Sequence, residues 1–479
     1  MEPEGHISFG NQGSNSGFQI GKNTGNIHRI FESPILSTIK LALKSSRGGL
    51  LRDAYRWILE DEAFKQWRYH GGNPSLWIRG DPGKGKTMLL CGIIDELTRS
   101  TGNCANVAFF FCQENDPRTN QATAVLRGLL YSLIKNQETL LSHVQTNYDH
   151  AGKDLFQDIN AFNALSRIFT NILSDPGLRD TYFVIDALDE CVIDLYRLLH
   201  FINRASSSHT QAKWIISSRN WPEIEERLGT QPLISSIRLE LNPEHITEAV
   251  HMFIQERVAR LSEAKRYSEK VRDEVHQHLM ANSQGTFLWV ALVCDELLRT
   301  SSWNARKRMA MFPPGLDKLY QRMISQISDS DDAELCTQIL AVTLTAYRPL
   351  TLAELLSYIS MPGDYSWDQE FISRIIDSCG SFLTVQNDSV TFVHQSAKDF
   401  LNRELPRILG SSLPAEHSRM FRQSLEIMSS CLRRDIFSLR LPGTSIETVK
   451  IPTPNPLATA EYACLYWVDH YQASSYYLD

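Results

Sequence analysis

The sequence contains none of the features that mark a membrane or secreted protein. No apolar run approaches the roughly eighteen residues that a membrane-spanning helix needs, and the start MEPEGHIS has neither the basic region nor the apolar core of a signal peptide. The nine cysteines form no C-x-x-C pair and no metal-ligand spacing, so we expect reduced, mostly buried thiols. These absences favour a soluble, cytoplasmic protein with no membrane segment.

A strong charge of either sign is also missing. Lysine and arginine number 48 against 55 aspartates and glutamates, which leaves a net charge of -7, and no long basic block occurs. Because proteins that bind nucleic acid carry basic patches that neutralise phosphates, we expect no nucleic-acid partner. The 479 residues, 42% of them apolar, are enough for about two to four domains with cores of their own.

The segment from Gly5 to His28 has little charge and little apolar mass. Lys22 is its one clear charge, and six glycines recur among Asn, Gln and Ser. Such a composition cannot offset the entropy of ordering, so the segment should be disordered in isolation. However, its apolar residues alternate within Ile7–Phe9 and Phe18–Ile20, as in short strands, and Asn and Gln can stack in register between identical chains. The segment is either a solvated leader or a tail that orders by templating.

A phosphate-binding loop follows the short apolar run LWI at 76–78. The loop reads GDPGKGKT and leads into an apolar run typical of a helix, which is the strand, loop and helix order of a P-loop. We expect its backbone N–H groups to wrap phosphates, Lys86 to reach the β- and γ-phosphates, and the Thr87 hydroxyl to ligate Mg²⁺. The predicted nucleotide-binding residues of the loop are Gly80, Asp81, Pro82, Gly83, Lys84, Gly85, Lys86 and Thr87.

A second nucleotide element is the segment TYFVIDALDE at 181–190. Its apolar residues predict a buried strand that ends at Asp186, with Asp189 and Glu190 on the turn beyond. This pattern indicates a Walker B strand, in which Asp186 holds Mg²⁺ and either Asp189 or Glu190 orients the attacking water. The residues leave open which of the two carboxylates has that role.

A third strand, KWIISSR at 213–219, places Arg219 at its tip. The carboxyl edge of a parallel sheet faces the phosphates of a bound nucleotide, so we expect Arg219 in the γ-phosphate crevice. With a buried strand at 106–112 and an apolar-periodic helix at 122–134, these elements predict a doubly wound α/β domain from about 67 to 240. No N-K-x-D motif for guanine occurs, which favours ATP, ADP or dATP over GTP.

The second half of the chain predicts helices. Amphipathic stretches occur at 271–280 and 287–298, and TLAELLSYIS, SFLTV and VTFVHQSAKDFL outline a winged helix with a hairpin near Asn387 and Asp388. Two further helices are expected at 417–432 and 457–470. No repeat of about 20 to 50 residues is evident, so we expect no solenoid or propeller in this chain, as in a fragment or a truncated allele.

Five motifs carry a family resemblance: GDPGKGKTML, FFFCQ, VLRGLLYSLI, VIDALDEC and WIISSR. In this order and spacing they resemble the NACHT domain of fungal STAND ATPases, which are NOD-like receptors. The resemblance implies a sensor-1 role for Arg219 and a winged-helix histidine, here His394, that contacts the β-phosphate of ADP and locks the closed state. Phe287 stands where related receptors carry a proline that packs on adenine, and we interpret it as a core residue.

The expected fold class is an α/β P-loop NTPase with a parallel sheet, followed by helical and winged-helix domains and preceded by a disordered, amyloid-forming tail. The predicted division is 1–30 for an amyloid motif, 31–66 for a helical linker, 67–240 for the NACHT domain, 241–325 for a helical domain, 326–405 for a winged helix and 406–479 for a C-terminal helical region.

The tail sequence HISFGNQGSNSGFQIGKNTGNIH at 6–28 resembles the amyloid repeat of the fungal HET-s/HET-S prion proteins. This resemblance implies a partner: a HET-S-like, pore-forming effector with matching repeats. The chain would then be a slow, switching NTPase that forms homo-oligomers on activation and templates cell death in fungal incompatibility. The alternatives are a constantly cycling AAA-type ATPase that remodels a macromolecule, and a scaffold with a degenerate nucleotide site.

Overall fold

The computed structural model describes most of the chain from residue 52 onward. The predicted amyloid motif at 1–30 and the first part of the predicted linker lie outside the described residues. The described ranges are 52–69, 73–102, 104–114, 116–145, 160–209, 211–229, 234–360, 374–376, 378–386, 388–409, 411–439, 449 and 451–474.

A five-stranded parallel sheet forms the N-terminal half, in the order β2-β3-β4-β1-β5. The strands are short apolar runs buried on both faces, which is the pattern of parallel sheets covered by helices. This arrangement confirms the predicted parallel α/β fold. The strands are β1 (Ser75–Arg79), β2 (Asn106–Phe111), β3 (Thr181–Asp186), β4 (Ala212–Ser218) and β5 (Ile234–Arg238).

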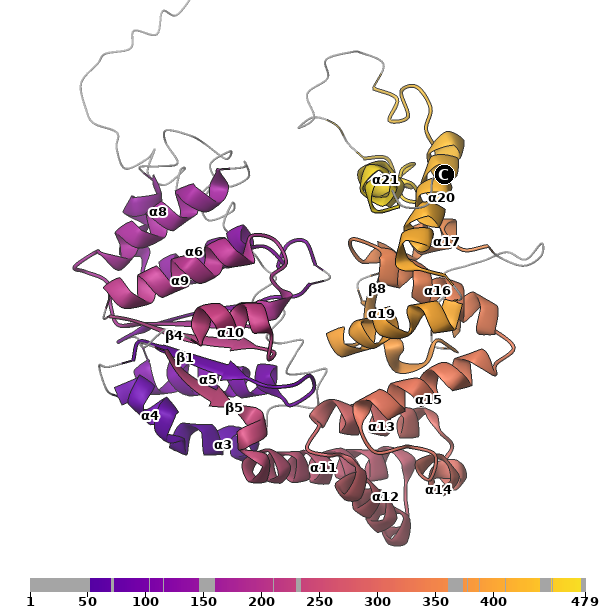
Figure 1. Ribbon diagram of the computed structural model, residues 1–479, viewed down its shortest axis with the longest axis horizontal. Helices are drawn as coiled ribbons and strands as arrows, with labels where there is room; N and C mark the ends of the chain where they lie inside the picture. The colour runs from indigo at the N-terminus through magenta and orange to yellow at the C-terminus, as the bar shows by residue number, and fades with distance from the viewer. Residues whose placement is uncertain are drawn as a thin grey trace, which may run out of the picture.

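Helices cover both faces of this sheet (Figure 1). Successive residues of a strand point to opposite faces: Leu76 and Ile78 pack with α3 (Arg52–Glu60), α4 (Glu62–Tyr69) and α5 (Lys86–Thr101), whereas Trp77 packs on the other side. The helices of that other side are α6 (Ala122–Asn136), α8 (Ala161–Leu173), α9 (Leu195–Ser208) and α10 (Pro222–Leu228).

The sequence predicted a helical linker at 31–66, and the structure adds two features at the borders of this half: the packing of helices from that region on the sheet, and a fifth strand. α3 and α4 pack on α5 and on β1, so they belong to the layer that covers the sheet although their residues fall largely within the predicted linker. β5 adds an edge strand beside β1, with Ile237 opposite Ile78. Only Ile237 of β5 is fully buried, and the strand therefore has a weak apolar signal.

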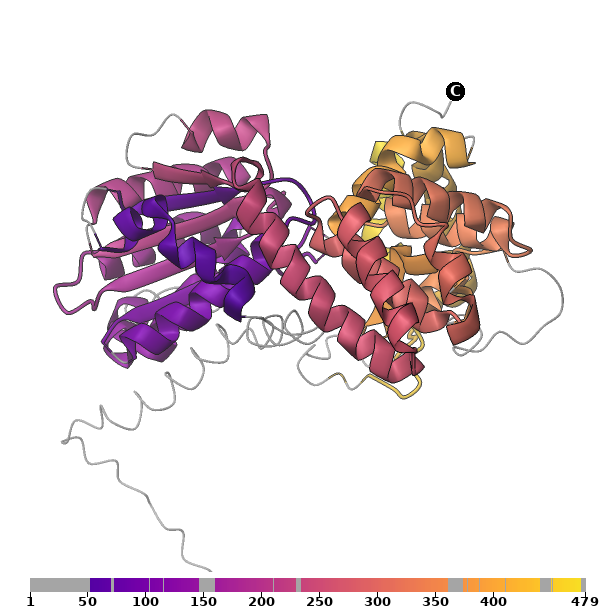
Figure 2. The ribbon, with the colours of Figure 1, turned by 90° about the horizontal axis from the view of Figure 1, so that it is seen from below.

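A helical segment follows the sheet and joins the two halves (Figures 1 and 2). The long helix α11 packs against α3 of the first half as well as against its neighbours α12 and α13. The helices of this segment are α11 (Pro243–Lys265), α12 (Glu269–Asn282), α13 (Phe287–Arg299), α14 (Ala305–Met309) and α15 (Leu316–Ser328).

The C-terminal half combines helices with a small antiparallel sheet in the order β6-β8-β7. β7 and β8 form the predicted hairpin, and Asp388, just before β8, has a positive φ of 63°. The elements are α16 (Ala333–Thr345), β6 (Leu350–Thr351), α17 (Leu352–Ser357), β7 (Leu383–Gln386), β8 (Ser389–Phe392), α19 (Gln395–Leu409), α20 (Leu413–Cys431) and α21 (Glu461–Ala473).

One apolar cluster runs from α3 and α5 through α11, α13 and α16 to α21. The helical segment therefore holds both halves through continuous packing rather than through a free linker. Within the described ranges, no helix combines the length and the apolar character that crossing a bilayer requires.

Candidate nucleotide site

The P-loop lies between β1 and α5, where the first strand feeds its helix. Gly83 and Gly85 have φ values of 77° and 86°, in the left-handed region that favours glycine. A Cβ on Gly85 would lie 2.9 Å from the ring of Phe287, and a Cβ on Gly83 would lie 2.9 Å from the Thr286 side chain. Both positions therefore require glycine for backbone geometry and for close packing against the start of α13.

Lys86 folds back over the loop. Its Nζ donates to the carbonyl oxygens of Gly80 at 2.5 Å and Asp81 at 3.0 Å. Burial lowers the pKa of Lys86, and the carboxylates of Asp189 and Asp186 oppose this shift. A buried ammonium among carbonyls and carboxylates is a strong anchor for a phosphate, because the low dielectric strengthens its field.

Asp186 stands at the end of β3, buried beside the loop. The hydroxyl of Ser217 on the adjacent strand β4 donates to Asp186 Oδ1 at 2.5 Å, which orients the carboxylate. Thr87 and Asp186 line the same cavity and fit the hydroxyl and carboxylate ligands that Mg²⁺ takes beside a nucleotide. Among the described residues no cluster of three or more His, Cys, Asp or Glu side chains could enclose a metal by itself, and Mg²⁺ at phosphates needs no such cluster.

The two further acidic residues of the β3 turn differ in their contacts. Asp189 forms an ion pair with Arg219, whose Nε lies 2.9 Å from Asp189 Oδ2 and whose backbone N–H donates to Oδ1 at 3.1 Å. Glu190 instead accepts the backbone N–H of Glu114 at 3.3 Å. Burial and the nearby charge of Asp189 raise the pKa of Glu190 to about 8, so its carboxyl is mostly protonated at neutral pH. In this arrangement neither group can act as a general base, because Asp189 is paired with Arg219 and Glu190 is mostly protonated.

The N-terminal turn of α19 reaches this site from the C-terminal half. Arg219 also pairs with Asp399, while Lys398 Nζ lies 2.9 Å from Glu114 Oε1. Gln395 donates to the other oxygen of Glu114. The sequence analysis did not single out Glu114, Gln395, Lys398 or Asp399. The available signal was their placement: Glu114 follows a parallel strand, and the three α19 residues share one helix face after His394.

His394 lies just before α19 and lines the cavity. Its Nδ1 accepts the backbone N–H of Ser396 at 3.1 Å and lies 2.8 Å from the Ser396 hydroxyl. Because Nδ1 accepts this bond, the ring proton of the neutral histidine is on Nε2. The ring thus caps the helix with one nitrogen and carries its donor on the other.

One cavity of about 1320 Å³ connects these groups. Of the predicted site residues, Gly80 and Asp81 are not part of its lining. Its walls come from both halves of the chain, since the hairpin β7–β8 and α19 close the side opposite the P-loop. The predicted site residues that line it are Pro82, Gly83, Lys84, Gly85, Lys86, Thr87, Asp186, Asp189, Glu190, Arg219 and His394.

Part of the cavity wall is aromatic. Tyr55 and Trp57 of α3, Phe253 of α11 and Phe287 of α13 line it, and the rings of Phe253 and Phe287 meet edge to face at 5.5 Å between centroids. Phe287 is half-buried and packs on Gly85, so it is both a packing residue and part of the cavity wall. Aromatic and aliphatic walls of this kind suit a flat heterocyclic base.

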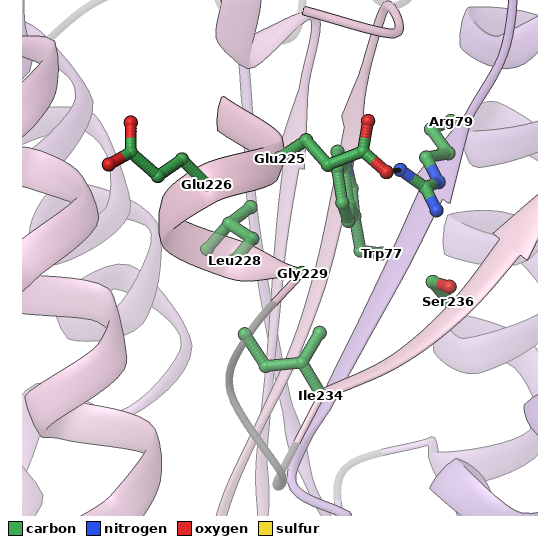
Figure 3. A pocket seen from close by; sticks show the side chains of 8 residues that line it. All are labelled: Trp77, Arg79, Glu225, Glu226, Leu228, Gly229, Ile234 and Ser236. Atoms are coloured by element: carbon green, nitrogen blue, oxygen red, sulfur yellow. Dashed lines mark hydrogen bonds and ion pairs between the residues drawn. The ribbon is translucent and has the colours of Figure 1, made fainter. Parts of the chain in front are cut away.

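A second, smaller cavity of about 280 Å³ lies between β1, β5 and α10 (Figure 3). Arg79 lies with its guanidinium 4.5 Å from the centre of the Trp77 ring and pairs with Glu225 at 2.5 Å. None of its lining residues comes from the P-loop or the β3 turn. Its size is at the lower limit for a small-molecule pocket, and Arg79 and Glu225 fasten α10 to the sheet there.

The parallel sheet, the P-loop between β1 and α5, and the acidic end of β3 define a P-loop NTPase. Residues 53–219 match the family model described as Nephrocystin 3, N-terminal. The chain is also 47% identical over 446 residues to the vegetative incompatibility protein HET-E-1 of Podospora anserina, a match that covers 90% of this chain and 33% of that protein. With these matches, the chain belongs to the fungal NACHT-type NOD-like receptors. It spans about a third of the length of this relative.

Solved structures show a more distant likeness. A Walker-type ATPase of Pyrococcus abyssi has 12% identity and a TM-score of 0.35 over 72% of this chain and 95% of its own. Cdc6p of Pyrobaculum aerophilum has 13% identity and a TM-score of 0.32 over 75% and 93% of the two chains. AMPPCP-bound DnaA of Aquifex aeolicus has 12% identity and a TM-score of 0.27 over 58% and 75%. Likeness at this level does not bear on function.

Proposed function

We propose that this chain is a nucleotide-operated signalling switch of fungal incompatibility. The observation that carries the proposal is that the nucleotide cavity is built by both halves, with the P-loop on one wall and His394 with α19 on the other. A ligand that contacts two parts of a protein shifts the equilibrium between their arrangements by its differential affinity. The described arrangement is then the closed form, which holds ADP.

Each part of the cavity has a role in this proposal. The P-loop and Lys86 bind the phosphates, Thr87 and Asp186 hold Mg²⁺, and His394 donates from Nε2 to the β-phosphate. Bound Mg²⁺ supplies charge neutralisation for phosphoryl transfer. The aromatic part of the wall receives adenine, so ATP, ADP and dATP are the expected nucleotides.

Hydrolysis is slow in the closed form because its general base is blocked. Asp189 is held by Arg219, and Glu190 is protonated and bonded to the Glu114 backbone. A carboxyl group accepts a proton from water only in its ionised form. Catalysis therefore requires that the α19 wall withdraw, so that water reaches Glu190 and lowers its pKa.

The output of the switch is clustering of the N-terminal tails. Opened copies form a homo-oligomer in the cytoplasm, and local tail concentrations rise to roughly millimolar, where segments such as 6–28 stack in register. The stacked tails template a HET-S-like, pore-forming effector. The 47% identity to a vegetative incompatibility protein supports the incompatibility role, and the tail resemblance supports the effector.

The nucleotide half of this proposal is tested with the purified full chain. We expect stoichiometric ADP to be released on denaturation, turnover well below about one per second, and loss of the bound nucleotide in Lys86→Ala. Multiple turnovers per second without tightly held ADP would instead indicate a cycling ATPase. If the wild type holds no nucleotide and Lys86→Ala behaves as the wild type does, the chain would instead be a scaffold with a degenerate nucleotide site.

The tail half has a separate test. A peptide of residues 1–30 should form fibrils and convert a soluble protein that carries the related repeat, whereas a peptide of the same composition in scrambled order should not. A peptide that stays soluble at high micromolar concentration, or fibrils that fail to convert that protein, would refute the output mechanism.

A further inference from the structure

The first turn of α19 contacts the NTPase half through three side chains on one helix face. Gln395 and Lys398 reach Glu114, which follows β2, and Asp399 reaches Arg219, which follows β4. Positions i, i+3 and i+4 of a helix lie on the same side, so one docking movement makes or breaks all three contacts together. The contacts meet at the carboxyl edge of the parallel sheet, beside the P-loop.

Arg219 pairs with two carboxylates, one from its own half of the chain and one from the other half. Asp189 is on the neighbouring turn of the same domain and is buried, with 2% of its side chain exposed. Asp399 comes from the other half of the chain and is 38% exposed, while Arg219 itself is 13% exposed. When α19 moves, Asp189 therefore stays with Arg219 and Asp399 leaves it.

The place left by Asp399 suits a phosphate. A guanidinium binds carboxylate and phosphate oxygens through the same planar donors. Arg219 also lines the nucleotide cavity together with Lys86 and Thr87. The anion nearest to Arg219 on the α19 side is thus either the Asp399 carboxylate or the terminal phosphate of a nucleotide, because two anions at one donor edge repel each other.

We propose that Asp399 takes the position of a third phosphate at Arg219, so that the closed arrangement accepts a nucleoside diphosphate and a triphosphate must displace α19. The inference rests on the proposed nucleotide switch and identifies Asp399 as the residue that discriminates between the two nucleotides. Lys398 and Gln395 strengthen the docking of α19, because Lys398 neutralises the Glu114 carboxylate and Gln395 donates a hydrogen bond to it. The backbone N–H of Glu114 in turn donates to Glu190 and holds that carboxyl group in its inactive position.

The test measures affinity rather than turnover. Nucleotide is removed from the full chain, and the nucleotide-free protein is titrated in the presence of Mg²⁺ with ADP and with a non-hydrolysable ATP analogue, while calorimetry measures binding. In Asp399→Asn we expect the affinity for the analogue to rise at least about fivefold relative to that for ADP, the lower end of typical coupling between sites. Asp399→Glu keeps the charge, so its ratio of analogue affinity to ADP affinity should equal that of the wild type.

Asp317→Asn is the matched control. Asp317 of α15 accepts from Arg403 of α19 at 3.1 Å, and both side chains are largely exposed, so this variant removes an ion pair of α19 that does not involve Arg219 or Glu114. Its ratio should equal the wild-type ratio. Thermal melting without nucleotide establishes that each variant is folded, and hydrogen exchange without nucleotide should rise in the first turn of α19 only in Asp399→Asn.

The outcomes separate this inference from the proposed function. A ratio in Asp399→Asn within about twofold of wild type, well below the coupling expected, overturns the role of Asp399 even if both nucleotides bind. An equal shift in Asp317→Asn overturns it too, because any α19 ion pair would then have the same effect. Failure of the wild type to bind either nucleotide refutes the switch itself.

Discussion

Lys84 of the P-loop donates from its Nζ to the carbonyl oxygen of Gln284, 2.9 Å away and 200 residues later in the chain. The same Nζ reaches the carbonyl oxygen of Gly285 at 3.1 Å. The two lysines of the GKGK sequence therefore differ in their contacts. Lys86 stays with the carbonyls of its own loop, whereas Lys84 ties the loop to the turn between α12 and α13.

Replacing Lys84 with methionine should loosen this tie and leave phosphate binding in place. We expect a loss of about 1 kcal/mol in the free energy of unfolding, since the hydrogen bonds are charged but partly exposed. Nucleotide affinity, measured by calorimetry, should fall far less than in Lys86→Met. Equal loss of affinity in the two variants would show that the Lys84 side chain binds phosphate.

Gly85→Ala should disable the site through geometry alone. The new Cβ meets the Phe287 ring at 2.9 Å, and the backbone has a φ of 86°. Gly102 is the matched control, because its φ of 54° imposes strain while nothing lies within 4 Å of its Cβ. We expect Gly102→Ala to cost about 1 kcal/mol and Gly85→Ala at least about twice that in urea unfolding, with nucleotide binding lost only in the latter. A similar loss of unfolding free energy in the two variants would show that the Phe287 ring moves aside without cost.

Glu190 should make the stability of the NTPase half depend on pH. Its folded pKa of about 8 exceeds the ordinary 4.5, so the stability that protonation provides is complete below about pH 4.5 and is lost as the pH rises toward 8. In urea unfolding from about pH 5 to 8, wild type should therefore lose on the order of 2 kcal/mol relative to Glu190→Gln. Glu223 is exposed, so the stability of Glu223→Gln should change with pH as that of the wild type does. Parallel profiles for wild type and Glu190→Gln would contradict the burial of a protonated carboxyl group.

A histidine pair should make the contact between α20 and α21 sensitive to acid. His417 and His470 face each other with 2.8 Å between their Nδ1 atoms, and His470 Nε2 lies 2.8 Å from the Tyr462 hydroxyl. Burial and the neighbouring His417 lower the pKa of His470 to about 3, and burial lowers that of His417 despite the charge of Glu416. Stability from the neutral pair is complete above pH 6.5 and is lost as the pH falls toward 3.

Hydrogen exchange of α21 measures this effect. Exchange should accelerate from about pH 6.5 to 4 beyond the intrinsic pH dependence. His470→Phe should be less stable by about 2 kcal/mol near neutrality, because His417 and Tyr462 lose a partner, but its loss on acidification should be smaller. His200→Phe alters an exposed histidine and should retain the wild-type dependence. An equally steep loss in His470→Phe would assign the acid sensitivity to other groups.

Local patterns predicted the sheet and much of the helical structure. β1, β3 and β4 are short apolar runs that end at glycine or polar residues, and β7 and β8 pair as the predicted hairpin. β5 was missed because a half-exposed edge strand carries little apolar signal. α3 and α4 were assigned to a linker because nothing in their sequence states which surface they cover.

The sequence by itself determined the P-loop, the acidic end of β3 and the parallel sheet, because these depend on neighbours within a few residues and on the burial of continuous apolar runs. Only the tertiary structure decided that Asp399 meets Arg219, that Lys84 bonds Gln284, and that Glu190 is enclosed beneath Glu114. These contacts join residues that lie about 80 to 200 positions apart, and long-range pairing leaves no local pattern. The pKa of a carboxyl group likewise depends on the burial and charges that the completed fold places around it.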